Sequence, residues 1–270
     1  MNSRQLNYLK ALDIDVWRRR EIDQANEDAS CAARTDIAPA PLHQSVSSEV
    51  RDNHTDSAQR FTASPTPHAE SQAEVLSDVS SLNWDELRSA VLGCTRCPLH
   101  LTRTQGVFGV GDREANWMII GEAPGADEDR QGEPFVGRAG QLLNAMLKAI
   151  GLKREQVFIA NILKSRPPNN RDPRPEEVRA CIPYLFRQIE LINPRLILCV
   201  GRIAAQTLLQ TNTPIGKLRG KVHRIAANRP MIVTYHPAYL LRSPGEKRKS
   251  WDDLLFAVRT FESLGMGDAV

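Results

Sequence analysis

Four short, almost continuously apolar segments constrain the fold of this chain more than any other feature. They cover residues 117–121, 157–163, 196–200 and 231–235. Strands that are apolar on both sides are typical of parallel sheets, in which helices cover both faces. Helical patterns separate these segments, and such alternation predicts an α/β fold. We therefore expect three α/β/α layers around a central, mainly parallel sheet of four strands.

The helical patterns between these segments have recognisable starts and ends. Ser81 or Asn83 can cap a helix that runs to Leu92. Pro175 followed by two glutamates is typical of a helix start, and Gly151 of a helix end. The apolar periodicity predicts further helices over residues 143–150, 178–192, 202–210 and 251–261.

The first 80 residues differ in composition from the rest of the chain. Residues 1–20 contain one short amphipathic helical pattern, and residues 21–80 are rich in Ala, Ser, Asp, Gln and Pro. Too few apolar groups are present there to offset chain entropy, so we expect 21–80 to be a disordered linker. The helix would then either dock on a partner protein or be an extension without a role. The folded domain is expected over residues 81–270.

Charge divides the chain in the same place. Residues 1–80 carry a net charge of −5 and residues 81–270 one of +8. Between Leu191 and Gly245 there are eight Lys or Arg residues and no Asp or Glu. Such a stretch favours a polyanionic partner such as a nucleic acid, although a solvated basic surface is the alternative.

Several protein classes do not suit this sequence. No apolar run approaches the roughly 20 residues that cross a bilayer. The first ten residues lack the apolar stretch of a secretory signal. The chain has five cysteines, an odd and unevenly spread set, which favours reduced thiols or a metal site over a disulfide scaffold. We expect a cytoplasmic protein without a membrane segment.

Unusual residues follow the strands, where an open parallel sheet binds its ligands. The first strand leads into Gly121-Glu122-Ala123-Pro124-Gly125, and soon after comes Gly132-Glu133-Pro134-Phe135-Val136-Gly137. The second strand runs into Asn161-Ile162-Leu163-Lys164-Ser165-Arg166-Pro167-Pro168. The fourth ends in Tyr235-His236-Pro237-Ala238-Tyr239-Leu240-Leu241-Arg242.

These segments, in this order, closely resemble the family 4 uracil-DNA glycosylases, the iron–sulfur branch of their superfamily. The resemblance covers about residues 82–264, which is nearly the whole expected domain. It implies a monofunctional DNA repair enzyme that flips uracil out of single- or double-stranded DNA and hydrolyses the N-glycosidic bond. An abasic site for base excision repair would remain.

The resemblance also implies which residues bind the base. Phe135 would stack on uracil, and the Asn161 amide would match both O4 and N3–H. Gly121, Ala123 and Asn170 would lie at the same pocket. Taken alone, Phe135 could be a core aromatic and Asn161 a turn residue at a strand end.

Cleavage of the bond builds positive charge on the sugar and negative charge on the departing base. His236 and loop amides are expected to stabilise the charge at uracil O2. Better-known members of the superfamily place an aspartate where this chain has Ala123, which leaves Glu122 and Glu128 as the carboxylates. Glu128 would either activate water or exclude the methyl group of thymine.

The segment after His236 resembles the part of the enzyme that enters the duplex. Leu240 would fill the gap that the flipped base leaves, and Arg242 would contact phosphate. An ordinary hydrophobic turn is the alternative. The basic residues 247–249 would suit further contacts to the DNA backbone.

Cys94 and Cys97 have the spacing of metal ligands, although a redox pair has the same spacing. The resemblance implies a [4Fe–4S] cluster with four cysteines, of which Cys181 is the last. At the remaining position this chain has Ser165. A serine oxygen or outside ligand could complete the cluster, a three-iron cluster or zinc could bind instead, or nothing could bind stably. Cys199 lies in an apolar strand and is expected to be a core residue.

Two other functions are compatible with the same fold. A related protein that traps uracil-DNA through a loop histidine is disfavoured, because no histidine lies between Ser165 and Cys181. A non-catalytic DNA-binding or replication-accessory module would not need to retain Phe135, Asn161 and His236. We therefore expect a uracil-DNA glycosylase that acts as a monomer.

Overall fold

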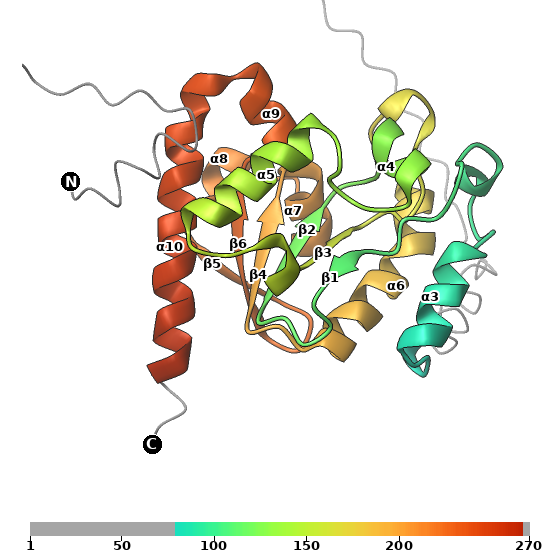
Figure 1. The fold of residues 1–270 in the computed structure, drawn as a ribbon, viewed down its shortest axis with the longest axis horizontal. Coiled ribbons are helices and arrows are strands. Elements are labelled where there is room, and N and C mark those ends of the chain that lie inside the picture. The colour runs from blue at the N-terminus through green and yellow to red at the C-terminus, as the bar shows by residue number, and fades with distance from the viewer. Residues whose placement is uncertain (1–78, 267–270) are drawn as a thin grey trace, which may run out of the picture. The chain divides into compact units, whose positions relative to one another are not determined.

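The computed structural model describes residues 79–266 of the chain (Figure 1). The expected helix in residues 1–20 lies outside this part. So does the expected linker over 21–80, except for residues 79 and 80. The described part holds one six-stranded sheet in the order β1-β3-β2-β4-β6-β5. Its strands have the following bounds: β1 Val110–Gly111, β2 Trp117–Gly121, β3 Phe158–Asn161, β4 Leu196–Val200, β5 Val222–Ile225 and β6 Arg229–Thr234.

The centre of the sheet is the parallel arrangement that the sequence predicted. β3, β2, β4 and β6 pair in parallel, with Ile119 opposite Ile159 on one side and Leu198 on the other. The prediction of four strands was incomplete, because β1 and β5 add an antiparallel strand at each edge. β1 has only two residues and β5 is mostly exposed, so neither has the continuous apolar run that marks a buried strand.

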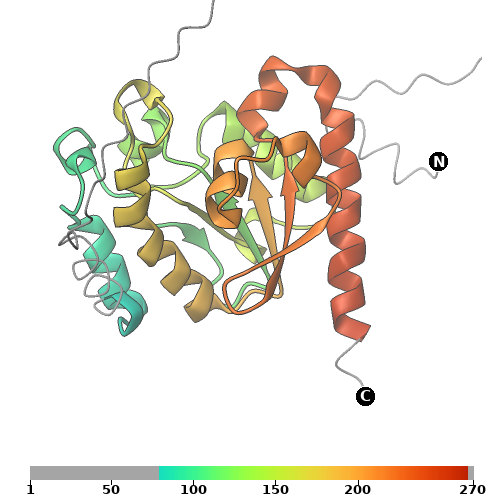
Figure 2. The ribbon, with the colours of Figure 1, turned by 180° about the vertical axis from the view of Figure 1, so that it is seen from behind.

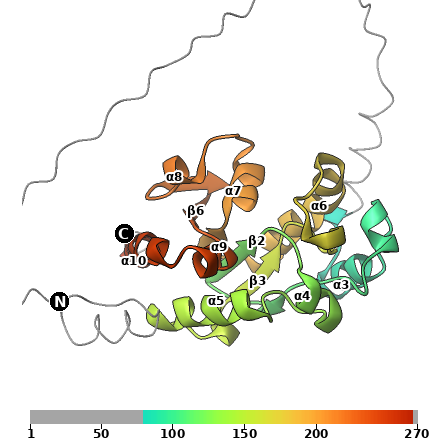
Figure 3. The ribbon, with the colours of Figure 1, turned by 90° about the horizontal axis from the view of Figure 1, so that it is seen from above.

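Helices cover both faces of the sheet, which gives the expected three layers (Figures 1 and 3). On one face, Met118, Ile120 and Cys199 pack in a core with helices α3, α6 and α7. On the other, Ile119, Leu198 and Ile232 pack with α5, α9 and α10. The helices of the two layers have the following bounds: α3 Trp84–Leu92, α5 Arg138–Ala149, α6 Pro175–Ile192, α7 Arg202–Leu209, α9 Pro237–Arg242 and α10 Lys247–Met266.

The helix boundaries follow local chemistry. Asn83 caps α3 with a complete capping box, in which its side chain accepts from the Glu86 N–H and Glu86 accepts from the Asn83 N–H. Such a cap stabilises a helix by about 1 kcal/mol. Short helices α4 (Ala126–Gln131) and α8 (Ile215–Leu218) lie in connections. α10, the long red helix of Figure 2, begins at Lys247, which is earlier in the sequence than its apolar stripe indicated. None of the described helices is long and apolar enough to span a membrane.

Candidate active site

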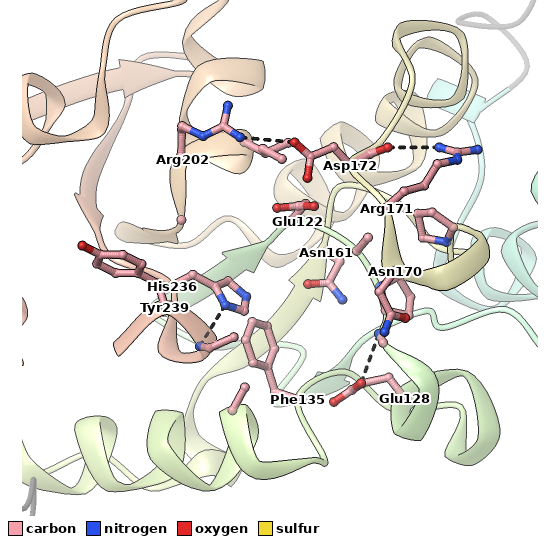
Figure 4. Close-up of a pocket in the computed structure, with 18 of the residues that line it drawn as sticks. Glu122, Glu128, Phe135, Asn161, Asn170, Arg171, Asp172, Arg202, His236 and Tyr239 are labelled. Atoms are coloured by element: carbon pink, nitrogen blue, oxygen red, sulfur yellow. Dashed lines mark hydrogen bonds and ion pairs between the residues drawn. The ribbon is translucent and has the colours of Figure 1, made fainter. Parts of the chain in front are cut away.

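The carboxyl ends of the four parallel strands meet at one edge of the sheet, and a cavity of about 720 Å³ lies there. Glu122 follows β2, Asn161 ends β3, Arg202 follows β4 and His236 follows β6. All four line the cavity (Figure 4). The topology therefore brings together polar residues that are far apart in the sequence, at the edge where parallel sheets bind ligands.

Asn161 presents an unpaired side-chain oxygen to this cavity. Its side chain is only 3% exposed, and its Oδ1 is buried without a hydrogen-bond partner. Buried polar groups are nearly always paired, so an unpaired acceptor in a cavity wall indicates a ligand that donates an N–H. The backbone of Asn161 is held by Lys164, whose Nζ donates to the Asn161 carbonyl at 2.8 Å. The same Nζ donates to Gln188 Oε1 at 2.6 Å.

Phe135 forms an aromatic wall of the cavity. Its ring centroid lies 5.5 Å from that of His236, at an interplanar angle of 31°. Its backbone has φ +55°, a left-handed conformation that costs a non-glycine residue about 1–2 kcal/mol. Gly121 makes room for the ring, because a Cβ there would lie 2.7 Å from Phe135 Cζ and 2.4 Å from Asn161 Oδ1. A glycine at residue 121 thus lets the ring and the amide approach the same strand end.

His236 is a neutral hydrogen-bond donor at physiological pH. Burial, and then the nearby Arg242, lower its pKa to about 4. Its Nδ1 accepts the Ala238 N–H at 3.1 Å, as the N-cap of α9. A neutral imidazole that accepts at Nδ1 carries its proton on Nε2. The N-cap bond therefore assigns the proton to the ring nitrogen available to a ligand.

Glu122 is the carboxyl group that titrates near neutral pH. Burial, and then the neighbouring Asp172, raise its pKa to about 7. Asp172 pairs with Arg202 at 3.2 Å, and Figure 4 shows Glu122 between this pair and Asn161. A carboxylate with such a pKa suits a general base at neutral pH.

Glu128 has a different environment from Glu122. Its Oε2 accepts the Gly125 N–H at 3.1 Å, and its Oε1 accepts the N–H groups of Val136 and Gly137 at 3.0 and 3.2 Å. Both oxygens are thus engaged by backbone amides on two walls of the cavity. This arrangement favours a structural role over water activation, while the carboxylate still lines the cavity where it can limit the size of a base.

The remaining predicted binding residues lie around the same cavity. Ala123 lines it, packed against the core. Asn170 lies exposed at the rim with a left-handed φ of +53°, and its Oδ1 accepts from Arg166 Nε at 2.7 Å. The structure therefore brings all of the expected base-binding residues to one place.

The segment expected to enter DNA is the short helix α9. Leu240 was predicted to fill the space of the flipped base, but its side chain is 1% exposed and packs in the core beside α5. The neighbouring Leu241 is 42% exposed, and Arg242 is exposed at the cavity rim. Helical periodicity explains the difference, because adjacent residues of a helix face different sides. Leu241 is therefore the better candidate for the wedge.

The expected cluster ligands come together from two segments. Cys94 and Cys97 follow α3, whereas Cys181 lies in α6 and is buried. The Tyr184 hydroxyl donates to Cys94 Sγ at 3.4 Å and the Lys164 N–H to Cys181 Sγ at 3.1 Å. Hydrogen bonds to sulfur are compatible with a cluster site, but the three thiols as placed here do not form a group that could hold a metal ion.

The fourth expected position, residue 165, has no thiol and is already hydrogen-bonded. Ser165 Oγ accepts a hydrogen bond from Arg103 at 2.7 Å, and the same guanidinium donates to the carbonyls of Leu92 and Cys94. Burial raises the pKa of Cys181 to about 12, so a bound metal would have to displace its proton. Among residues 79–266 no three His, Cys, Asp or Glu side chains form a group that could hold a metal ion. Cys199 is buried in β4, as expected of a core residue.

Sequence reasoning did not identify Arg202, Asp172 or Arg154 as site residues. Arg202 had a usable signal, since it follows the third predicted strand just as Glu122 and His236 follow the first and fourth. Asp172 is recognisable only through its pairing with Arg202. Arg154 contacts the loop of Phe135 from outside the cavity, which no local pattern indicates.

The α/β fold, with a polar and aromatic cavity at the ends of its parallel strands, defines the class of protein. Comparison with known proteins identifies the family. The model of the uracil DNA glycosylase superfamily matches residues 108–255, and the chain belongs to this superfamily. Within it, the chain is 48% identical over 167 residues to a type-4 uracil-DNA glycosylase of Archaeoglobus fulgidus, covering 59% of this chain and 84% of the relative. It is 43% identical over 180 residues to one of Pyrobaculum aerophilum, covering 64% and 92%.

Proposed function

We propose that this chain removes uracil from DNA by hydrolysing the N-glycosidic bond, in base excision repair. The observation that carries the proposal is the buried, unpaired Oδ1 of Asn161, in a cavity that Phe135 and His236 also line. Uracil offers the N3–H that this oxygen lacks, and its O4 accepts from the Asn161 amide nitrogen. The type-4 relatives support the same substrate.

The chemistry follows from the charges that develop. Water adds to C1′ of the sugar while the C1′–N1 bond breaks and its electron pair passes to the uracil ring. The neutral His236, which donates from Nε2, would stabilise the negative charge at O2. Glu122, as a carboxylate, would orient the water and accept its proton. The uracil anion then takes up a proton from solvent, and Glu122 releases the proton that it accepted, so free uracil and an abasic site are the products.

We also propose that Cys94, Cys97 and Cys181 hold an iron–sulfur cluster with one non-cysteine corner. When bound, such a group would tie the segment after α3 to α6 and contribute no redox step to hydrolysis. The two hydrogen bonds to sulfur support this proposal. A cytoplasmic location, a monomeric state and a protein partner for residues 1–20 stay predictions.

Excision from a single-uracil oligonucleotide in EDTA tests the proposed function. Alkaline cleavage reveals abasic sites, and a thymine oligonucleotide is the control. We expect strand breaks at uracil only, in both single strands and duplexes. Binding of uracil-DNA without any breaks would instead support a non-catalytic DNA-binding module.

A further inference from the structure

Phe135 is held in an unfavourable backbone conformation by contacts from two sides. Its φ of +55° belongs to the left-handed region, which glycine adopts easily but which is unfavourable for a residue with a side chain such as Phe. The ring lies beside Gly121 and His236, whereas the backbone of this loop makes separate hydrogen bonds with two charged side chains. Residues in such conformations persist where the surroundings over-determine them.

One side of this support is Arg154, in a short 3₁₀ turn (Arg154–Gln156) outside the cavity. Its Nη2 donates to the Pro134 carbonyl at 2.6 Å and its Nη1 to the Phe135 carbonyl at 3.2 Å. Nη1 also contacts Asn144 Oδ1 at 3.3 Å, on α5. A planar guanidinium holds the two successive carbonyls with two separate nitrogens in a fixed geometry, whereas an ammonium would have to reach both from a single nitrogen.

The other side is Glu128, whose Oε1 accepts the N–H groups of the next two residues, Val136 and Gly137. Three successive peptide groups around Phe135 are therefore held by two opposite charges, two carbonyls by the cation and two amides by the anion. Gly140 allows the loop to pack this closely, because a Cβ there would lie 1.8 Å from the Phe135 oxygen.

We propose that Arg154 is a positioning residue for base recognition, which acts with Glu128 by holding the Phe135 ring where the flipped base must stack. This inference rests on the proposed function, since it assigns Phe135 to the base. Arg154 does not line the main cavity, so it contacts neither base nor sugar. Its influence must pass through the ring, and small displacements of binding groups can lower rates by about 100-fold.

The test compares Arg154→Ala with Lys153→Ala, an exposed cation one residue away. Under single-turnover conditions with a single-uracil duplex, we expect Arg154→Ala to lower the excision rate about 10- to 100-fold. Arg154→Lys should fall between, and Lys153→Ala should stay within about twofold of the unchanged protein. Thermal melting shows whether each variant is folded.

Two further measurements separate positioning from a general structural effect. In a Phe135→Gly background, which removes the ring and the strain together, Arg154→Ala should change the rate by less than about twofold. Affinity for a duplex with a 2′-fluoro-deoxyuridine, which resists cleavage, should fall with Arg154→Ala, while affinity for an abasic-analogue duplex should not. Equal losses in both backgrounds, or for both duplexes, would overturn the proposal. No excision by the unchanged protein would instead defeat the proposed function.

Discussion

The segment from Asn161 to Cys181 joins two regions that differ in how completely they match the type-4 pattern. At its start, the pocket holds Asn161 with Phe135 and His236, all in one cavity. At its end, the cysteine region has Cys181 with Cys94 and Cys97 but a serine at residue 165. One region contains every residue that is expected to bind the base, and the other has a serine where the resemblance implies a fourth cysteine.

The difference indicates that the pocket has its own supports. Lys164 donates to the Asn161 carbonyl and is itself positioned by Gln188, and Glu128 and Arg154 hold the loop of Phe135. In the cysteine region, Arg103 joins Ser165 directly to the Cys94 segment. A direct hydrogen bond thus provides there part of the connection that a fourth ligand would make. We expect substitutions in the pocket to affect excision far more than those at residue 165.

The largest effect is expected for Asn161→Ala. It removes the donor and the acceptor that read the base edge, so the excision rate should fall about 1,000-fold. Duplex affinity should stay within a few-fold, because phosphate contacts provide most of it. Single-turnover excision and equilibrium binding on one uracil duplex measure both. Undiminished excision would mean that another group reads the base.

The parallel strands, and the residues that follow them, were predictable because both signals are local. An apolar run marks each central strand, and the edge rule then places Asn161 and His236 together. The sequence did not predict the edge strands β1 and β5 or the burial of Leu240, because these features depend on tertiary packing. The Arg103–Ser165 bond was equally hidden, since 62 positions separate its residues.

A smaller effect, with a pH signature, is expected for Glu122→Gln. The raised pKa of about 7 means that the active carboxylate forms as pH rises, so excision should increase through pH 7 and then level off. His236, with its pKa near 4, stays neutral over this range. The variant should be about 100-fold slower above pH 8 and should lose the rise.

Rates measured from pH 5 to 9 at constant ionic strength test this. Asp127→Asn is a matched control, since Asp127 precedes Glu128 on α4 and does not line the pocket. A rise that persists in Glu122→Gln would assign the titration to another group. The general base would then be a group other than the carboxylates of Glu122 and Glu128.

The smallest effect on excision is expected for Ser165→Cys, although it changes the cysteine region most directly. A fourth thiol beside Cys94, Cys97 and Cys181 should increase bound iron and acid-labile sulfide per chain, because thiolates are the ligands that iron–sulfur clusters prefer. The excision rate should change less than about twofold, since the pocket is held by Lys164, Glu128 and Arg154. Ser165→Ala is the control, because it removes the hydroxyl that accepts from Arg103 without adding a ligand. If Ser165→Cys raised excision tenfold while Ser165→Ala did not, the cysteine region would limit the pocket, and the independence of the two regions would be refuted.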